Sequence, residues 1–238
     1  MTEKIEIVYT YSSDRYDNLL KEYWGLDMFE KLMKDKKKLV LLLLVIAILI
    51  VVLVFVIMNL SDGGKDTNKF KKEYEKLNNV ATEDGKKYPY VSIPADNKMK
   101  YVDYEGVLAI FNNMEDEVIY LGNAECLYCR SAVQVLVNTA VASEIDEIYY
   151  LDTSKKSDKY EELMEVLGDN FVEEKDGEKK IYEPLVIFVV DGKVVSYNKG
   201  TLFSQGSPYT ELDKSQIEGL GGIYESGIND VLDAKKIG

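Results

Sequence analysis

The sequence predicts an α/β domain, built on a mixed sheet flanked by helices and preceded by a single transmembrane helix. Three observations lead to this prediction. Residues 39–58 are apolar without interruption, short strand and helix patterns alternate further along the chain, and Asp191-Gly192 separates two runs of strand-forming residues. Alternating strands and helices favour parallel neighbours, whereas an Asp-Gly pair between strands is typical of an antiparallel hairpin, so the sheet should be mixed.

The apolar run has the length of a membrane-spanning helix. At ~1.5 Å of rise per residue, its 20 residues reach ~30 Å, the thickness of a bilayer's hydrocarbon core. The alternative is a buried helix of a globular domain, but such helices rarely lack polar residues on every face. A cleaved signal peptide fits poorly, because 38 residues precede the run and no A-x-A-like site follows it. The lysines at 36–38 favour a cytoplasmic N-terminus and an extracytoplasmic C-terminal domain.

Four segments are therefore expected. They are a cytoplasmic N-terminal tail at 1–38, a transmembrane helix serving as signal anchor at 39–59, a stalk and N-terminal extension at 60–106, and the α/β domain at 107–238. A hinge is expected at Gly63-Gly64, directly after the anchor. The tail carries aromatic and aliphatic residues at roughly helical spacing, which suits either a short extension resting at the lipid headgroups or a helix that docks a partner.

The elements after the anchor follow from the spacing of apolar residues. Helical spacing predicts a stalk helix over 70–80 and a short helix at 107–111, with a strand at 101–104 between them. The pattern then predicts, in chain order, a strand at 118–121, a helix at 127–142, a strand at 148–151, a helix at 160–167, and a hairpin of strands at 185–190 and 193–197. A last helix is expected within 213–232, interrupted around Gly219, Gly221 and Gly222.

Composition excludes several classes of chemistry. The 238 residues contain no histidine, which excludes His-based triads, His-ligated zinc and imidazole acid–base catalysis. The formal net charge is −13, with 29 Lys and Arg against 42 Asp and Glu, so nucleic acid is not an expected partner. Two cysteines, Cys126 and Cys129, remain to carry most of the chemistry.

The two cysteines lie where a redox-active pair would be. Cys126 falls at the start of the predicted helix, where free N–H groups and the helix dipole stabilise a thiolate, and Cys129 lies one turn further in. This placement predicts that Cys126 attacks a disulfide and that Cys129 resolves the mixed disulfide. The alternatives are a metal site, for which two thiols offer too few ligands in one chain, and a structural disulfide, which would restrict the unfolded chain little across so short a loop.

A proline adds independent support. Pro184 enters a strand pattern immediately after Glu183, although proline cannot donate to a sheet's hydrogen-bond ladder. A cis peptide bond beside the dithiol would account for it and would leave the backbone of residue 183 open to strand-like pairing with a substrate. The alternative is a trans proline that ends a surface loop.

The motif and the element order resemble the thioredoxin fold over about residues 107–232. The stretch from Tyr120-Leu121-Gly122 to Cys126-Leu127-Tyr128-Cys129-Arg130 resembles small thioredoxin-like proteins of Gram-positive bacteria, including bacteriocin transport accessory proteins. The resemblance implies that Cys126 is the attacking thiol, Cys129 the resolving thiol and Pro184 the cis-proline. Glu183, Pro184 and Tyr128 would then contact the substrate.

Several positions depart from that family's pattern. Tyr120 stands where thioredoxins carry a buried Asp, Leu127 replaces the proline of the glutaredoxin-like Pro-Tyr pair, and Glu183 replaces a small or β-branched residue. The 54 residues between Cys129 and Pro184 exceed the usual spacing, and the charged stretch 168–182 is the expected insertion. It would be either a solvated loop or a flap that selects substrates.

Together these features predict a membrane-anchored extracytoplasmic thiol–disulfide oxidoreductase with no cofactor or metal beyond its dithiol. Expected partners are cysteine-containing exported or surface proteins, the membrane, and a membrane redox partner. Arg130 should favour the Cys126 thiolate while Glu125 and Glu183 oppose it, which predicts a moderately reducing or balanced exchanger. The alternatives are a non-catalytic accessory or binding module of a secretion or bacteriocin-type transport system, and soft-metal carriage by the two thiolates.

Overall fold

The computed structural model describes residues 36–175, 177–201 and 207–237, with the side chains of 36, 38, 39, 42, 53–63 and 175 left outside the description. The chain divides into two units, residues 1–60 and 61–238. The expected cytoplasmic tail at 1–38 lies almost entirely outside the described residues.

Helix α3 (Lys36–Glu75) is the first element, and its 40 residues include the apolar run. It continues through Gly63 and Gly64, so the predicted hinge is wrong; a glycine inside a helix costs only about 1 kcal/mol relative to alanine. The stalk helix ends at Glu75, five residues before its predicted end, and turns follow it. Within the part of the chain described, no helix meets the length and apolar content required to cross a membrane. Positions 53–59 of the predicted span have side chains outside that part.

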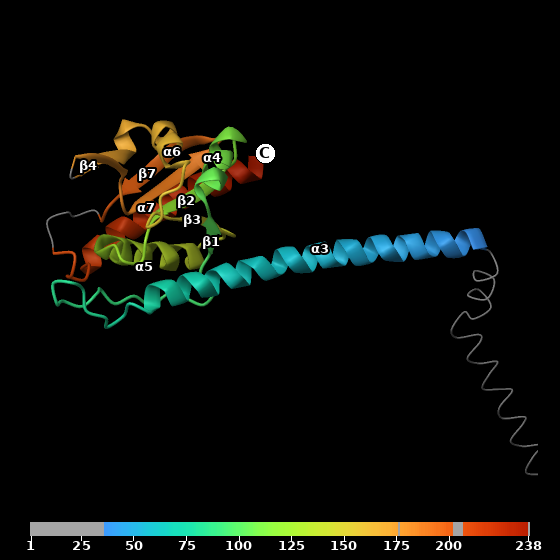
Figure 1. The fold of residues 1–238 in the computed structure, drawn as a ribbon, viewed down its shortest axis with the longest axis horizontal. Helices are drawn as coiled ribbons and strands as arrows, with labels where there is room; N and C mark the ends of the chain where they lie inside the picture. The colour runs from blue at the N-terminus through green and yellow to red at the C-terminus, as the bar shows by residue number, and fades with distance from the viewer. Residues whose placement is uncertain (1–35, 176, 202–206, 238) are drawn as a thin grey trace, which may run out of the picture. The chain divides into compact units, whose positions relative to one another are not determined.

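A five-stranded mixed sheet forms the centre of the second unit (Figure 1). The strands lie in the order β1 (Met99–Val102), β3 (Ile148–Asp152), β2 (Glu117–Gly122), β6 (Leu185–Val190), β7 (Lys193–Lys199). Both β1 and β2 run parallel to β3, whereas β6 is antiparallel to β2 and to β7. Asp191 and Gly192 join β6 to β7 with positive φ angles of 50° and 66°, as a two-residue hairpin requires. The predicted mixed sheet is confirmed.

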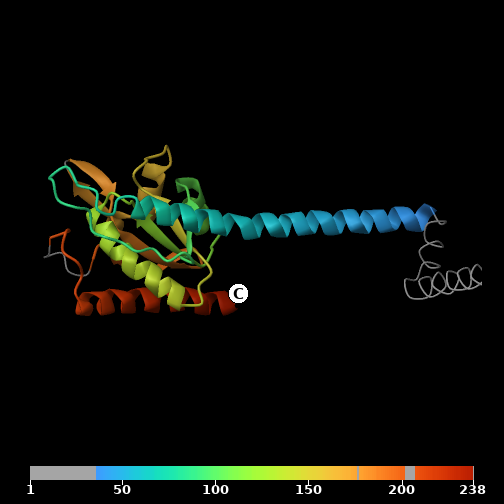
Figure 2. The same cartoon turned by 90° about the horizontal axis from the view of Figure 1, so that it is seen from below.

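Helices cover both faces of this sheet. Along β2, Val118 and Tyr120 join the apolar cluster on the face covered by α5 (Leu127–Ala142) and α7 (Lys214–Ile237). Ile119 and Leu121 join the opposite cluster, which packs against α4 (Tyr104–Asn112) and α6 (Tyr160–Leu167). Helices α5 and α7 lie side by side beneath the sheet (Figure 2). Because both faces are buried, the central strands are apolar throughout rather than alternating.

Three details differ from the sequence-based expectation. Residue 103 is not part of a strand, because the Asp103 carboxylate accepts the Gly106 N–H and caps α4, which begins at Tyr104. Helix α7 is continuous through Gly219, Gly221 and Gly222, where an interruption was predicted. The charged stretch 168–182 is not an irregular loop but a short helical turn, η1 (Asp169–Phe171), followed by a hairpin of β4 (Val172–Lys175) and β5 (Glu178–Ile181).

Gly227 lies against the buried ring of Phe188, and this contact yields the first prediction. A Cβ at Gly227 would lie 2.4 Å from carbons of the fully buried Phe188 ring, so Gly227→Ala should destabilise the domain by about 1–3 kcal/mol through overpacking. The matched control is Gly222→Ala on the same helix, where a Cβ meets nothing within 4 Å and should stabilise by up to about 1 kcal/mol. Thermal unfolding of the full chain in detergent compares them; equal midpoints would contradict this account of the packing.

Candidate active site

Cys126 lies at the N-terminus of α5 and caps the helix with its own side chain. Its Sγ accepts the backbone N–H of Cys129 at 3.2 Å, and its extended backbone is the conformation expected of a helix cap. Cys126 is partly exposed, whereas Cys129 is completely buried. Both are free thiols. The pair thus presents one sulfur to solvent and holds the second behind it, as the sequence predicts.

The pKa values of the two thiols are shifted in opposite directions. Hydrogen bonds from the Cys129 side chain and from backbone N–H groups at Cys129 and Tyr128 lower the pKa of Cys126, against the opposing effects of burial and of the Glu183 carboxylate. Burial, together with the neighbouring Cys126, raises the pKa of Cys129 well above that of an ordinary thiol. The more accessible sulfur therefore belongs to the more acidic thiol, and the buried one must lose a proton before it can react.

Asn123 organises the loop before the helix, and the sequence-based analysis missed it. Its Oδ1 accepts the backbone N–H groups of Cys126 at 2.9 Å and Glu125 at 3.0 Å, while its Nδ2 donates to Glu183 Oε2 at 2.7 Å. An Asn three residues before the N-cap of a helix is typical of an Asx turn and could have identified this role. Its hydrogen bond to Glu183 joins residues 60 positions apart, so no short sequence pattern predicts that contact.

Glu183 and Pro184 lie beside the dithiol, and the peptide bond between them is cis, as predicted. A carboxylate oxygen of Glu183 and the sulfurs of Cys126 and Cys129 all lie within 4.8 Å of one another. Three such atoms are one ligand fewer than a structural zinc site requires, and we assign no metal ion to them.

The groups that act most strongly on the pKa of Cys126 do not include Arg130 or Glu125. The Arg130 side chain is completely buried and donates to the backbone carbonyls of Tyr74, Pro89 and Ala124 and to Asn78 Oδ1. In the described structure Arg130 is a packing anchor, meaning that it holds these segments together through buried hydrogen bonds. The groups that lower the pKa of Cys126 are local hydrogen-bond donors. Glu125 is exposed and meets the site through its backbone N–H.

Tyr128, which lies between the two cysteines in the sequence, has an exposed side chain. Its side chain is 38% exposed and borders a small hollow of about 50 Å³, lined also by Ser131, Thr201, Pro208 and Leu212. An exposed aromatic ring two residues along the chain from Cys126 offers an apolar contact for an approaching peptide.

Tyr120 lies on the buried side of the pair. Its hydroxyl is 2.9 Å from the Tyr74 hydroxyl and makes a long contact of 3.5 Å to the Cys129 carbonyl oxygen. A Cβ at Gly122 would lie 2.7 Å from the Tyr120 hydroxyl and 3.0 Å from Cys129 Sγ, so only glycine fits between them. Burial raises the pKa of Tyr120 well above its ordinary value, and the phenol therefore stays neutral. The acidic group beside the sulfurs comes from Glu183 and not from position 120.

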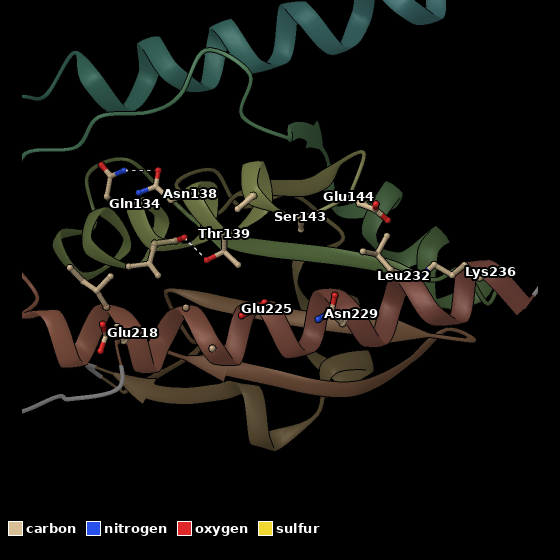
Figure 3. Close-up of a pocket in the computed structure, with 15 residues that line it drawn as sticks. Gln134, Asn138, Thr139, Ser143, Glu144, Glu218, Glu225, Asn229, Leu232 and Lys236 are labelled. Atoms are coloured by element: carbon tan, nitrogen blue, oxygen red, sulfur yellow. Dashed lines mark hydrogen bonds between the residues drawn. The ribbon is translucent and has the colours of Figure 1, made fainter.

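A larger groove, of about 720 Å³, runs between α5 and α7 (Figure 3). Asn138 and Thr139 lie on its α5 side, and Glu225 and Asn229 on its α7 side. Neither cysteine nor Glu183 lines it, so the groove and the dithiol are separate features.

A scan against protein-family models finds no match for the chain, and a search of curated proteins finds no similar protein.

Proposed function

We propose that residues 61–238 form a thioredoxin-like thiol–disulfide oxidoreductase, in which Cys126 attacks a substrate disulfide and Cys129 resolves the mixed disulfide. One observation carries the proposal: a partly exposed thiol of lowered pKa caps α5, and a buried thiol of raised pKa lies one turn behind it. This asymmetry is what stepwise disulfide exchange needs, because one sulfur meets the substrate and the other reacts only within the protein. Tyr128 and the backbone next to Pro184 would contact the substrate.

We further propose that α3 anchors this domain outside the cytoplasmic membrane, with its substrates among cysteine-containing exported or surface proteins. Support comes from the 20 uncharged residues at 39–58, and from the apolar side chains described between Val40 and Val52, which are exposed. The lysines at 36–38 favour a cytoplasmic N-terminus. No cofactor is needed, since the dithiol itself carries the two electrons.

Trapping tests this proposal. In cells expressing full-length Cys129→Ser and quenched with acid, Cys126 should accumulate in mixed disulfides, because the resolving thiol is missing. Non-reducing gels and mass spectrometry identify the adducts, and the locations of the trapped proteins report which side of the membrane the domain faces. The control is Cys126→Ser/Cys129→Ser. Absence of adducts, together with slow alkylation of Cys126 at neutral pH, would contradict oxidoreductase activity.

The second candidate function is a non-catalytic accessory module of a secretion or bacteriocin-type transport system. The groove between α5 and α7 favours it, since that surface includes neither cysteine. Full biological activity in the double serine variant would support this function over exchange.

A further inference from the structure

The resolving step requires Cys129 to lose its proton, and Cys126 does not account for where that proton goes. Cys129 is completely buried, and burial raises the pKa of its thiol well above the usual range. A neutral thiol is a poor nucleophile, so the attack on the mixed disulfide requires an acceptor for the Cys129 proton.

Glu183 is placed to be that acceptor. Among the acidic side chains that the structure describes, it is the one grouped with both sulfurs, with the three atoms within 4.8 Å of one another. That separation is within reach of one bridging water, and such contacts commonly shorten when substrate binds. Asn123 holds the carboxylate by its 2.7 Å hydrogen bond, and the partial exposure of Glu183 allows the proton to pass on to solvent.

We propose, resting on the oxidoreductase function above, that Glu183 is the proton acceptor for Cys129 during resolution. The Cys129 S–H proton moves to the carboxylate, directly or through one water, while Cys129 Sγ bonds to Cys126 Sγ. The bond between Cys126 and the substrate sulfur breaks, and its electron pair leaves with that sulfur, which then takes up a proton. Over both steps, the substrate disulfide is reduced to two thiols and the protein dithiol is oxidised to a disulfide. In the opposite direction Glu183 returns the proton to Cys129.

The other titratable groups around Glu183 do not compete for this role. The phenols of Tyr104 on α4 and Tyr160 on α6 interact electrostatically with it, and burial raises the pKa of both, so they stay neutral. Asp152 acts electrostatically on Tyr104, and Lys180 acts on Tyr160. The carboxylate is therefore the base on this side of the dithiol.

Glu183→Gln separates proton transfer from structure, because the amide oxygen can still accept the Asn123 hydrogen bond. Full-length protein in detergent is mixed with a fluorescent peptide disulfide, and stopped flow follows peptide release. At pH 7 the resolving step of Glu183→Gln should be slower by about 10²-fold, and its rate should rise with pH as hydroxide replaces the missing base. Attack by Cys126, measured in the Cys129→Ser background, should not slow, because the substitution removes a charge that opposes the thiolate. Glu183→Asp should give an intermediate rate.

The control is Glu161→Gln, which removes an exposed carboxylate from α6 and should resolve like the parent protein. If Cys126 forms the mixed disulfide and Glu183→Gln releases the peptide at the parent rate at every pH, the inference is overturned while the oxidoreductase function stands. If the Cys129→Ser protein forms no mixed disulfide, the proposed function fails, and this inference fails with it.

Discussion

Replacing Cys126 with serine is expected to abolish disulfide exchange, with a loss of at least about 10³-fold in the rate of peptide disulfide reduction. A serine hydroxyl stays protonated at neutral pH and cannot replace a thiolate whose pKa the surrounding donors lower. Cys129 cannot substitute, because it is completely buried. The full-length protein in detergent, recycled by excess dithiol and assayed with a fluorescent peptide disulfide, provides the measurement.

The same variant separates loss of chemistry from loss of fold. Cys126 is the N-cap of α5, and serine is among the best capping residues, so Cys126→Ser should keep the hydrogen bond to the Cys129 N–H. Its unfolding midpoint should therefore stay close to that of the parent protein. More than about a tenth of the parent rate remaining in Cys126→Ser would contradict the role of this sulfur as nucleophile.

Local patterns predicted most of the domain. Helices α5 and α6 begin and end at the predicted residues, and β2, β3 and the β6–β7 hairpin lie within two residues of their predicted bounds. These elements have uniform apolar faces and clear turn residues, so their spacing alone identifies them. The cis bond at Pro184 was predictable for a similar reason, because a proline entering an interior strand calls for a special backbone.

What the sequence did not predict depends on contacts between distant residues. The β4–β5 hairpin is strongly charged and has no apolar alternation to reveal it, and it contacts the core through one end, at the paired residues Val172 and Ile181. Gly219, Gly221 and Gly222 look like helix breakers, but α7 continues through them, and Gly221 lies near Val135 and Thr139 of α5. The buried contacts of Arg130 were not predictable, because its acceptors lie up to 56 residues away, while its neighbour in sequence is Cys129.

Arg130→Met is expected to cost about 3–5 kcal/mol of folding stability, lowering the unfolding midpoint by about 10 °C. The guanidinium satisfies three backbone carbonyls and the Asn78 amide oxygen, and so ties α5 to the chain segment from Tyr74 to Pro89. Methionine fills much of the same volume but leaves these acceptors without a donor. Lysine should recover only part of the loss, because one ammonium cannot serve four acceptors arranged around a planar fork.

The pH dependence of Cys126 alkylation in the same variant distinguishes a packing role for Arg130 from an electrostatic one. If Arg130 acts as a packing anchor, the midpoint for Cys126 should stay where it is in the parent protein, because the donors that lower this pKa are Cys129 and two backbone N–H groups. If the guanidinium instead stabilised the thiolate, Arg130→Met would raise the midpoint even at temperatures where the variant is fully folded. A stable variant with a raised midpoint would therefore contradict the placement of Arg130, whereas an unstable one with an unchanged midpoint is the expected result.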